Sequence, residues 1–494
     1  MKFRLSFVFF IVFVLFSCHR DVRDVKLSDA QIFKDERFVV NRTKLHQHLI
    51  QLCGGSNRFH RNVAMRNYYD KYESFIWIDN SFNLDKADTL LSWLRYVQAD
   101  GISPKIFHLR KIEGLMNKLK NYDIKRNESL SIMLADLDYL LTIDYLRYVD
   151  GMKFGFVNPE LIYNNLEELQ SISDTIGSSE KKKMLFDLKI YHPNVEFDMA
   201  ALESVKYGLN GFLTRVQPTS NEYILLKDKL SHVRGISLQN KIALNMERFR
   251  WKMLLNRGSK YLWINLADYT LYGIDHHSGD TISMKVCQGS LEHKTPILSS
   301  RITHVEINPY WVLPKSIVRR EVIPGMMRDN MYLENRDIKV LDKKGKEVNP
   351  HSISWNAQAD DIPYTFRQDN GGENSLGRLI FRFKNGFSIF LHDTNSHDAF
   401  SNNDRAVSHG CIRLERPLDL VWFLMENKDR ARMQQIKNAT LKEDVKRPGY
   451  YLFNKPIPLF LIYFTVYVDN RGIVRFCSDP YGYDVPLSKA LNQL

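Results

Sequence analysis

Residues 379–413 read LIFRFKNGFSIFLHDTNSHDAFSNNDRAVSHGCIR and carry the strongest structural signals of the chain. Apolar runs at 379–383 and 387–391 stand on either side of Lys384-Asn385-Gly386. An Asn-Gly pair between two such runs is typical of a tight antiparallel hairpin. We therefore predict two paired strands here, with His392 just past the end of the second strand.

The sequence around this stretch predicts a mainly β domain over about residues 258–435. Segments that mix apolar and β-branched residues recur at 261–266, 281–287 and 302–307, as expected for short strands joined by turns. Residues 314–363 interrupt them with charged and turn-rich sequence. We expect this stretch to form a lid-like insertion that caps one face of the sheet.

A last β-ribbon is expected near the end of the chain. Its two strands, 458–468 and 473–477, surround the turn Asn470-Arg471-Gly472. We predict that residues 436–494 form this ribbon and a tail that packs on the β domain.

The preceding residues, 67–257, have the pattern of a helical domain. Apolar side chains recur there at three- and four-residue steps, which indicates one buried stripe: Leu130, Leu134, Leu137, Leu141, Tyr145 and Tyr148. A chain of 494 residues with 44% apolar residues can bury more than one core. The predicted fold class is α+β, with a mostly helical N-terminal domain and a mainly β domain after it.

The first residues of the chain are typical of an export signal. Lys2 and Arg4 precede an apolar run over residues 5–16, and Ser17 and Cys18 follow it. The run is too short to span a bilayer comfortably. A cysteine directly after a small residue resembles the bacterial lipoprotein signal, in which the thiol is acylated after cleavage.

On this interpretation residues 1–17 are a signal peptide, Cys18 is the lipid attachment site and residues 18–66 form a linker. The protein would lie at the periplasmic face of a bacterial envelope, anchored to a membrane by lipid. The alternative is an ordinary signal peptide with Cys18 as a bystander. Both interpretations export the protein.

The chain carries a formal net charge of +12, which favours an anionic partner. Its basic residues are scattered, with no long basic run. For an exported protein we expect the cell wall or a membrane surface as that partner, and no nucleic acid. A well-solvated surface without a specific partner is the alternative.

The five cysteines include no CxxC pair and no spacing typical of metal ligands. We therefore expect no metal site built from cysteines and no disulfide framework. Cys53, Cys287 and Cys477 are most simply buried apolar side chains, although their sequence positions leave one bridge among them open.

Cys411, with His392 and His409, has the composition of a nucleophilic site. The thiolate is the attacking species, and a nearby imidazole can take the thiol proton. Gly410 allows a sharp turn that bares consecutive N–H groups toward a developing oxyanion. The spacing of 392 and 411 permits this arrangement without requiring it. For an arbitrary Cys and His, an inert buried thiol and a surface imidazole would be the simpler interpretation.

The segment resembles the YkuD-type L,D-transpeptidase motif, a histidine followed after a loop by [Ser/Thr]-His-Gly-Cys-x-[Asn/Arg]. The resemblance implies that Cys411 is the nucleophile, His392 the general base, and the backbone carbonyl of Asp393 the group that orients the base. It places His409 beside the thiolate or the substrate carbonyl. The N–H groups of Gly410 and Cys411 would form the oxyanion hole.

The same resemblance gives Ser408 and Arg413 supporting roles at the substrate, Arg413 either binding a carboxylate or bracing the loop. It extends to the large YcbB-like branch, whose landmarks include Asn308-Pro309-Tyr310-Trp311 and Arg367-Gln368. Trp311 and Arg367 would then shape the substrate cleft, although core packing and a surface ion pair are alternatives for them.

Two departures from that branch stand out. Phe390 occupies a position that usually holds tyrosine, so no hydroxyl acts there. Only about a dozen residues separate Leu230 from Ile242, where the branch often inserts a peptidoglycan-binding module. Glycan affinity would have to come from the scaffold, the cleft or the basic surface.

The resemblance implies attack of Cys411 on a peptidoglycan stem tetrapeptide, loss of D-alanine, and transfer of the thioester to the side-chain amine of another stem, giving a 3-3 cross-link. The reaction implied by the resemblance requires no metal or organic cofactor. The resemblance also implies covalent inhibition by carbapenem-type β-lactams. Water as acceptor would make the protein an L,D-carboxypeptidase. A non-catalytic peptidoglycan-tethering lipoprotein is another alternative, and a cysteine peptidase is disfavoured because papain-like and caspase-like motifs are absent around Cys411.

Overall fold

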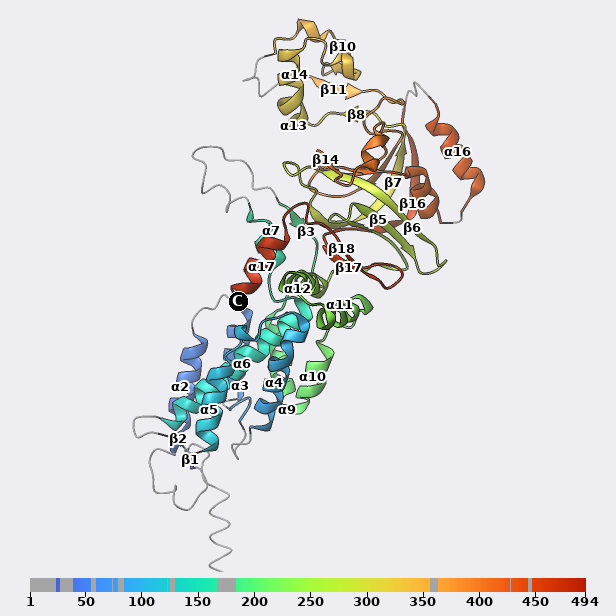
Figure 1. The fold of residues 1–494 in the computed structure, drawn as a ribbon. Helices are drawn as coiled ribbons and strands as arrows, with labels where there is room; N and C mark the ends of the chain where they lie inside the picture. The colour runs from blue at the N-terminus through green and yellow to red at the C-terminus, as the bar shows by residue number, and fades with distance from the viewer. Residues whose placement is uncertain are drawn as a thin grey trace, which may run out of the picture.

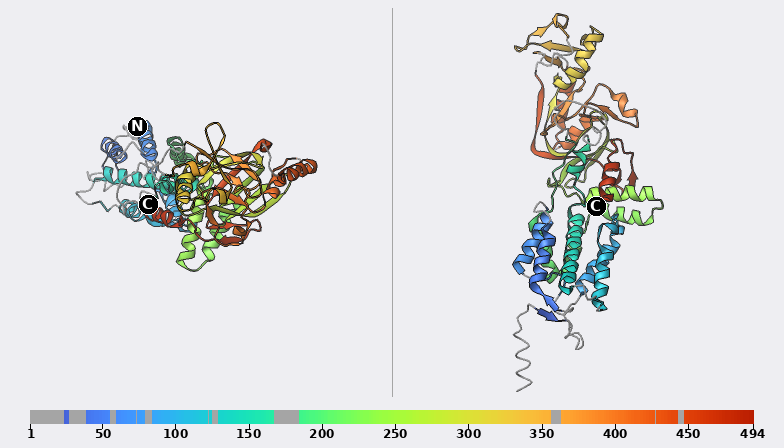
Figure 2. Two further views of the ribbon diagram at one scale, coloured as in Figure 1. Left: turned by 90° about the horizontal axis from the view of Figure 1, so that it is seen from above. Right: turned by 90° about the vertical axis from the view of Figure 1, so that its left-hand side faces the viewer.

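The computed structural model describes residues 24–26, 39–54, 59–72, 74–78, 84–121, 123–124, 129–166, 184–355, 363–426, 428–442 and 447–494. Helices dominate the N-terminal half and strands the C-terminal half, so the α+β fold class is confirmed. The two halves lie end to end (Figures 1 and 2). Cys18 and the whole of the predicted signal lie outside the described residues.

The helical half is built around α6 (Leu130–Phe154), whose predicted stripe is buried at all six positions. Its other elements are β1 (Asp24–Lys26), β2 (Val39–Asn41), α2 (Arg42–Cys53), α3 (His60–Tyr72), α4 (Asp85–Arg95), η3 (Tyr96–Asp100), η4 (Pro104–Ile106), α5 (Leu109–Lys120), α7 (Pro159–Tyr163), α9 (Val195–Tyr207), α10 (Leu209–Arg215), α11 (Asn221–His232) and α12 (Ile236–Arg250). Among the described helices, none is long and apolar enough to cross a membrane.

Most of the described strands of the second half form one sheet that closes on itself. It contains β4 (Lys260–Asn265), β5 (Thr270–Asp275), β6 (Thr281–Gly289), β7 (Ile297–Ile307), β12 (Leu379–Phe383), β13 (Leu391–His392), β14 (Ala406–Ser408), β15 (Ile412–Leu414) and β16 (Gly449–Ile462). Their order is β12-β13-β15-β6-β5-β4-β16-β7, and β7 pairs again with β12. The short β3 (Phe186–Asp187) pairs with β7 and joins the helical half to this sheet.

The predicted insertion is a small unit with its own apolar core, which includes Leu313, Val322, Leu333 and Phe366. Its strands run in the order β10-β9-β11-β8 and its helices cover one side of them (Figure 1). The elements are β8 (Trp311–Val312), α13 (Lys315–Ile317), the π-helical η6 (Val318–Val322), α14 (Ile323–Arg328), η7 (Glu334–Arg336), β9 (Ile338–Leu341), β10 (Glu347–Val348), η8 (Pro350–Ser352) and β11 (Thr365–Gln368). The unit thus begins at β8 and ends at β11, slightly wider than the expected 314–363.

The C-terminal segment differs from the predicted ribbon. Residues 449–462 form β16, which lies inside the closed sheet, parallel to β4 and antiparallel to β7. Only β17 (Val466–Val468) and β18 (Val474–Phe476) make a hairpin, and Val466 packs with Tyr223 and Met246 of the helical half. The final helix α17 (Asp484–Asn492) lies between the two halves (Figure 1). Two further helices, α15 (Pro417–Leu424) and α16 (Arg430–Thr440), flank the sheet.

The predicted tight hairpin around Asn385-Gly386 is a longer loop. Strands β12 and β13 do pair antiparallel, Ile380 opposite His392. Residues 384–390 connect them, because the Asn385 side chain accepts a bond from Phe387 N (2.9 Å) and donates one to Ile389 O (2.8 Å). His392 is consequently the last residue of β13 and is buried, whereas we expected it just past the strand.

Candidate active site

The pairing of β13 with β15 brings His392 and Cys411 to the lining of one cleft. The strands are parallel, with Leu391 opposite Ile412 and His392 opposite Arg413. Side chains alternate along a strand and paired residues share a face. Leu391 and Ile412 point into the apolar core and are fully buried. His392 and Cys411, each one position away, both line the cleft beside these strands.

A tight turn precedes Cys411. Gly410 has a φ of +111°, a conformation that residues with a Cβ rarely adopt. Ser408 Oγ donates to the Cys411 carbonyl (2.6 Å) and accepts from the Gly410 amide (3.1 Å). Thr295 Oγ1 donates to the Gly410 carbonyl (2.9 Å). The turn is thus held by side-chain hydroxyls from within and from the neighbouring loop.

These bonds change the expected roles of two residues. Ser408 is buried at the edge of the cleft and its hydroxyl is used inside the turn, so it braces the loop. The Gly410 amide, expected in the oxyanion hole, donates to Ser408. Sequence alone does not show these hydrogen bonds, because the Ser408 hydroxyl could equally have pointed toward a substrate.

The imidazole of His392 is oriented by its own neighbour. Its Nδ1 contacts the backbone carbonyl of Asp393. The Asp393 carboxylate accepts from the Arg378 amide (2.8 Å) and fills the space beside Gly377, where a Cβ would lie 2.5 Å from Asp393 Cγ. The carbonyl is therefore fixed in place and holds the Nδ1 side of the ring.

The thiol and the imidazole are both electrically neutral at ordinary pH. Burial lowers the pKa of His392 to about 4, with Arg413 and Arg382 acting in the same direction against the Asp393 and Leu376 carbonyls. Burial raises the pKa of Cys411 to about 11, opposed by the Phe390 amide and the two arginines. Such a pair stores no thiolate, so the proton must move when substrate arrives.

A cleft of about 550 Å³ lies between the sheet and the insertion. The sheet contributes His392, Ser408, His409, Cys411 and Arg413, while the insertion contributes residues from 311 to 338 and Gln368. Its volume is in the usual range for ligand sites. Cys411 is a half-buried residue in the lining of this cleft, beneath the insertion.

Two polar contacts join the insertion to the catalytic loops. His409 Nε2 contacts the Glu321 carboxylate, and Arg320 Nη1 lies 3.1 Å from His293 Nε2. The rings of His293 and His409 are 4.9 Å apart. His409 thus lines the cleft but points to the insertion. Glu321, Arg320 and His293 were missed from the sequence, because no local pattern marks a contact between distant segments.

The remaining predicted residues separate into two groups. Trp311 and Arg413 line the cleft. Arg367 does not belong to its lining, because it pairs with Asp369 (2.7 Å) and stands 4.7 Å over the Tyr310 ring. Arg367 therefore matches the alternative of a surface ion pair and contributes to the insertion's rim, not to the substrate cleft.

The other cysteines take no part in the site. All four cysteines in the described part of the chain are free. Cys53 and Cys287 are buried and Cys477 is half-buried, so no bridge forms among them. The side chains of His60, Asp150 and Asp198 lie within 4.8 Å of one another in the helical half. That cluster already holds internal bonds, His60 to Asp198 and Arg61 to Asp150, both at 2.6 Å.

The second half thus combines a closed sheet with a thiol and an imidazole that both line the cleft beneath the insertion. Residues 259–431 match the model of the YkuD L,D-transpeptidase catalytic domain, and residues 63–230 match the Scaffold domain. The chain therefore carries a YkuD L,D-transpeptidase catalytic domain joined to a scaffold domain. The YcbB-like branch is consistent with this pair.

Two individual proteins are similar to this chain. A Haemophilus influenzae protein named "Putative L,D-transpeptidase" is 30% identical over 255 residues, which are 51% of this chain and 50% of that protein. The chain thus matches about half the length of this relative. An L,D-transpeptidase structure from Mycobacterium smegmatis shares 13% identity over 41% of this chain and 58% of its own, with a TM-score of 0.20, too low to support an argument.

Proposed function

We propose that this protein is a peptidoglycan L,D-transpeptidase that joins stem peptides through an acyl-enzyme on Cys411. The observation that carries the proposal is that His392 and Cys411, brought together by the pairing of β13 with β15, line one cleft roofed by the insertion. The catalytic-domain match supports the same conclusion.

In the first step the Cys411 sulfur attacks the carbonyl carbon of the third residue of a donor tetrapeptide. His392 Nε2 takes the thiol proton as the C–S bond forms, since a neutral thiol is a poor nucleophile. The carbonyl becomes an oxyanion, for which the Cys411 amide is the proposed donor. The C–N bond to D-alanine then breaks, and His392 returns the proton to the leaving amine.

The second step transfers the acyl group from sulfur to nitrogen. The side-chain amine of a diamino acid on another stem attacks the thioester, and His392 removes a proton from it. The C–S bond breaks and the sulfur regains a proton, which leaves a 3-3 cross-link and the free enzyme. Water in place of the amine gives the L,D-carboxypeptidase reaction, so exclusion of water by the insertion favours transfer.

The cationic lining of the cleft fits the acidic stem peptide. The lining contains three cationic side chains, Arg320, Arg336 and Arg413, and one anionic side chain, Glu321. We assign Arg413 to a substrate carboxylate, because its side chain opens into the cleft. Carbapenem-type β-lactams would acylate Cys411 by the first step. Export, periplasmic location and lipid attachment at Cys18 are parts of the same proposal, since peptidoglycan stems lie outside the cytoplasmic membrane.

The test is incubation of the full chain with disaccharide tetrapeptide, followed by mass spectrometry. We expect dimers that have lost D-alanine, absent with Cys411→Ala and retained with Cys477→Ala, which removes a thiol remote from the cleft. Trimmed tripeptides alone would replace the proposal with a carboxypeptidase. Unchanged substrate with the wild-type chain would overturn catalysis and leave the tethering role.

A further inference from the structure

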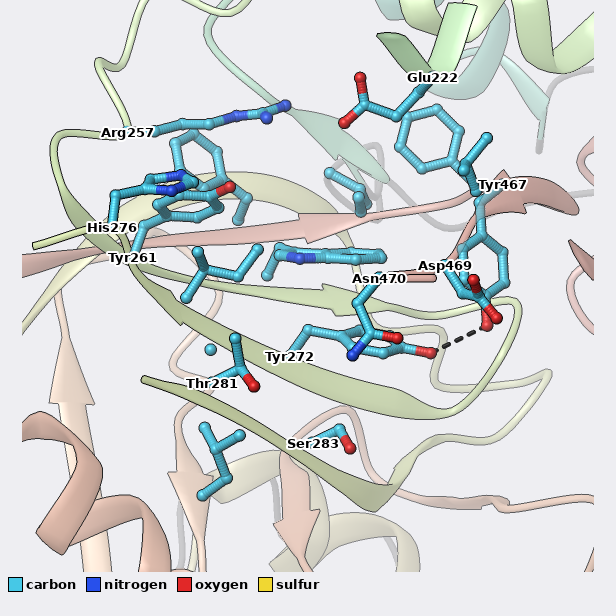
Figure 3. A pocket seen from close by; sticks show the side chains of 18 of the residues that line it. Glu222, Arg257, Tyr261, Tyr272, His276, Thr281, Ser283, Tyr467, Asp469 and Asn470 are labelled. Atoms are coloured by element: carbon cyan, nitrogen blue, oxygen red, sulfur yellow. Dashed lines mark hydrogen bonds between the residues drawn. The ribbon is translucent and has the colours of Figure 1, made fainter. Parts of the chain in front are cut away.

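A second cavity, of about 530 Å³, lies away from the catalytic cleft and shares no lining residue with it. Strands β4, β5 and β6 form its floor, and the start of α11, the end of α12 and the C-terminal hairpin close its sides. Figure 3 shows aromatic and polar side chains from these elements converging on one space. We refer to it as the aromatic groove.

Stacked rings cover the floor of the aromatic groove. Trp263 and Tyr272 are cross-strand partners whose rings lie 4.3 Å apart and nearly parallel, at 16°. Tyr467 meets the Trp263 ring edge-on at 6.1 Å. Phe249 and Phe464 form a second parallel pair at 4.4 Å. The groove thus offers flat apolar faces to a ligand.

Tyr467 is buried, whereas Trp263 and Tyr272 lie at the border of the packed core and are only partly buried. Leu262 and Ile264, the neighbours of Trp263 on β4, are fully buried on the opposite face of the sheet. Trp263 and Tyr272 stay partly exposed, although burying such rings completely would stabilise the fold. An aromatic platform left open to solvent indicates a site for contact with another molecule.

Polar side chains also flank the platform, and three of them keep hydrogen-bonding groups available to a ligand. Within the part of the chain that the structure describes, Glu222, Arg257 and Asn470 have no ion pair or hydrogen bond from their side chains. Arg257 stands 5.6 Å over the Tyr261 ring. Figure 3 shows Glu222 and Arg257 at one edge of the groove, and Ser283 and Asn470 on the other side of the platform. Donors and acceptors therefore flank flat apolar surfaces.

The charges of the groove argue against a polyanion. Asp275 and Asp469 are already neutralised by Lys260 (3.0 Å) and Arg475 (2.7 Å). The other acidic and basic side chains of the lining, Glu222 and Arg257, have opposite signs, so the net charge of the groove is close to zero. Grooves that bind single-stranded nucleic acid combine aromatic stacking with a strong positive charge. The lining fits an uncharged ligand with flat apolar faces and many hydroxyl and amide groups.

We propose that the aromatic groove binds the glycan strand of peptidoglycan, a β-1,4-linked polymer of N-acetylated amino sugars. The inference rests on the proposed function, which makes this polymer the natural ligand of the chain. The apolar faces of the sugar rings stack on Trp263 and Tyr272. Glu222, Arg257 and Asn470 bond their hydroxyl and acetamido groups. The groove supplies glycan affinity that no inserted binding module provides.

The groove and Arg413 of the cleft lie on the same face of the sheet. Trp263 is opposite Tyr272, Tyr272 opposite Ser283, and Cys287 opposite Arg413. Residues 283 and 287 share a face of β6, separated by roughly 13 Å at about 3.3 Å per residue. A strand held in the groove would leave the cleft open to a stem peptide, since the two sites have separate linings.

The test measures binding of the β-1,4-linked N-acetylglucosamine tetramer to the full chain by calorimetry. It is done in the Cys411→Ala background, so that it does not depend on turnover. We expect saturable binding that Trp263→Ala weakens at least about tenfold, the scale of one lost stacking contact. Arg257→Ala, at an exposed position, should weaken it severalfold without affecting folding. Tyr207→Ala removes an aromatic ring that is 80% exposed on α9 and serves as the matched control.

Two results would overturn the groove assignment: no binding of the tetramer, or binding that is unchanged in both groove variants. Displacement of the tetramer by sugar-free stem tetrapeptide would make the groove a peptide site instead. Failure of the proposed function is separable, because an inactive wild-type chain that still binds the tetramer through Trp263 retains the groove and loses only the reaction.

Discussion

His409, next to the glycine of the catalytic turn, contacts Glu321 of the insertion through Nε2. This contact, with the one between Arg320 and His293, ties the roof of the cleft to the loops that hold the thiol. Both partners are more than a third exposed, so the contact is worth less than about 1 kcal/mol. A contact of this strength can bias a lid without locking it.

Removing the contact between His409 and Glu321 should therefore change how the acyl-enzyme divides between hydrolysis and transfer more than it changes the stability of the fold. For Glu321→Gln we expect the ratio of hydrolysed to cross-linked product to rise by up to about fivefold, the factor that 1 kcal/mol represents. Product analysis by mass spectrometry measures the ratio. Glu334→Gln is the control, because Glu334 pairs with His351 (3.0 Å) within the insertion. Equal ratios in the two variants would show that the contact does not hold the lid.

Because the Cys411 thiol is neutral, we expect its alkylation rate to keep rising with pH through the neutral range, without a plateau. Only the thiolate reacts with iodoacetamide, and the pKa of Cys411 is raised to about 11. The thiolate fraction, and with it the alkylation rate, should climb about tenfold per pH unit from pH 6 to pH 10. Peptide mass spectrometry follows modification at Cys411. A rate that levels off below pH 8 would indicate a thiolate–imidazolium pair instead.

The hydroxyl of Ser408 should matter for rate rather than for binding. Ser408→Ala removes both bonds that fix the turn before Cys411. We expect kcat to fall on the order of tenfold to a hundredfold, the cost of a small misplacement of a reacting group, with little change in KM. Ser408→Thr restores the hydroxyl and should recover most of the rate. Equal loss in both variants would assign the effect to packing.

Local patterns predicted the fold class and the match to the catalytic domain, since short stretches of sequence are enough to indicate both. The stripe from Leu130 to Tyr148 needs only helical periodicity, and the motif at 408–413 needs only residue identity. The register that places His392 beside Arg413 depends on pairing between strands joined by a 19-residue connection. No periodicity within either strand encodes it.

The same limit explains the misplaced C-terminal segment. Residues 449–462 have strand composition, but their position between β4 and β7 depends on two long-range pairings, one parallel and one antiparallel. The Asn385-Gly386 turn failed for a local reason, because the Asn385 side chain satisfies the loop backbone in a longer connection. The contacts of Glu321 and His293 depend on how the insertion packs over the cleft, which no local sequence pattern indicates.

The strongest stability prediction concerns Asp138, buried in the centre of the helical half. Its carboxylate accepts from the amides of Ile76 (3.1 Å) and Trp77 (2.9 Å) and from the hydroxyl of Tyr69 (2.8 Å). Asp138→Ala leaves the two buried amides without an acceptor, each at about 1–3 kcal/mol, while the Tyr69 hydroxyl keeps Thr142 Oγ1 at 3.2 Å. We expect the free energy of unfolding of the helical half to drop by about 3 kcal/mol or more.

Hydrogen exchange of the α6 amides localises this loss to the helical half. Asp136→Ala is the matched control, because Asp136 lies on the same helix and bonds His48 (2.9 Å) nearer the surface; it should cost under about 1 kcal/mol. Burial also raises the pKa of Asp138 to about 6, so its folded form binds the proton more tightly than the unfolded chain does. The contribution of Asp138 to stability must then fall as pH rises from about 4 to about 6, and this slope should vanish in Asp138→Ala. An unchanged slope, or equal protection of α6 in the two variants, would mean that Asp138 does not organise this core.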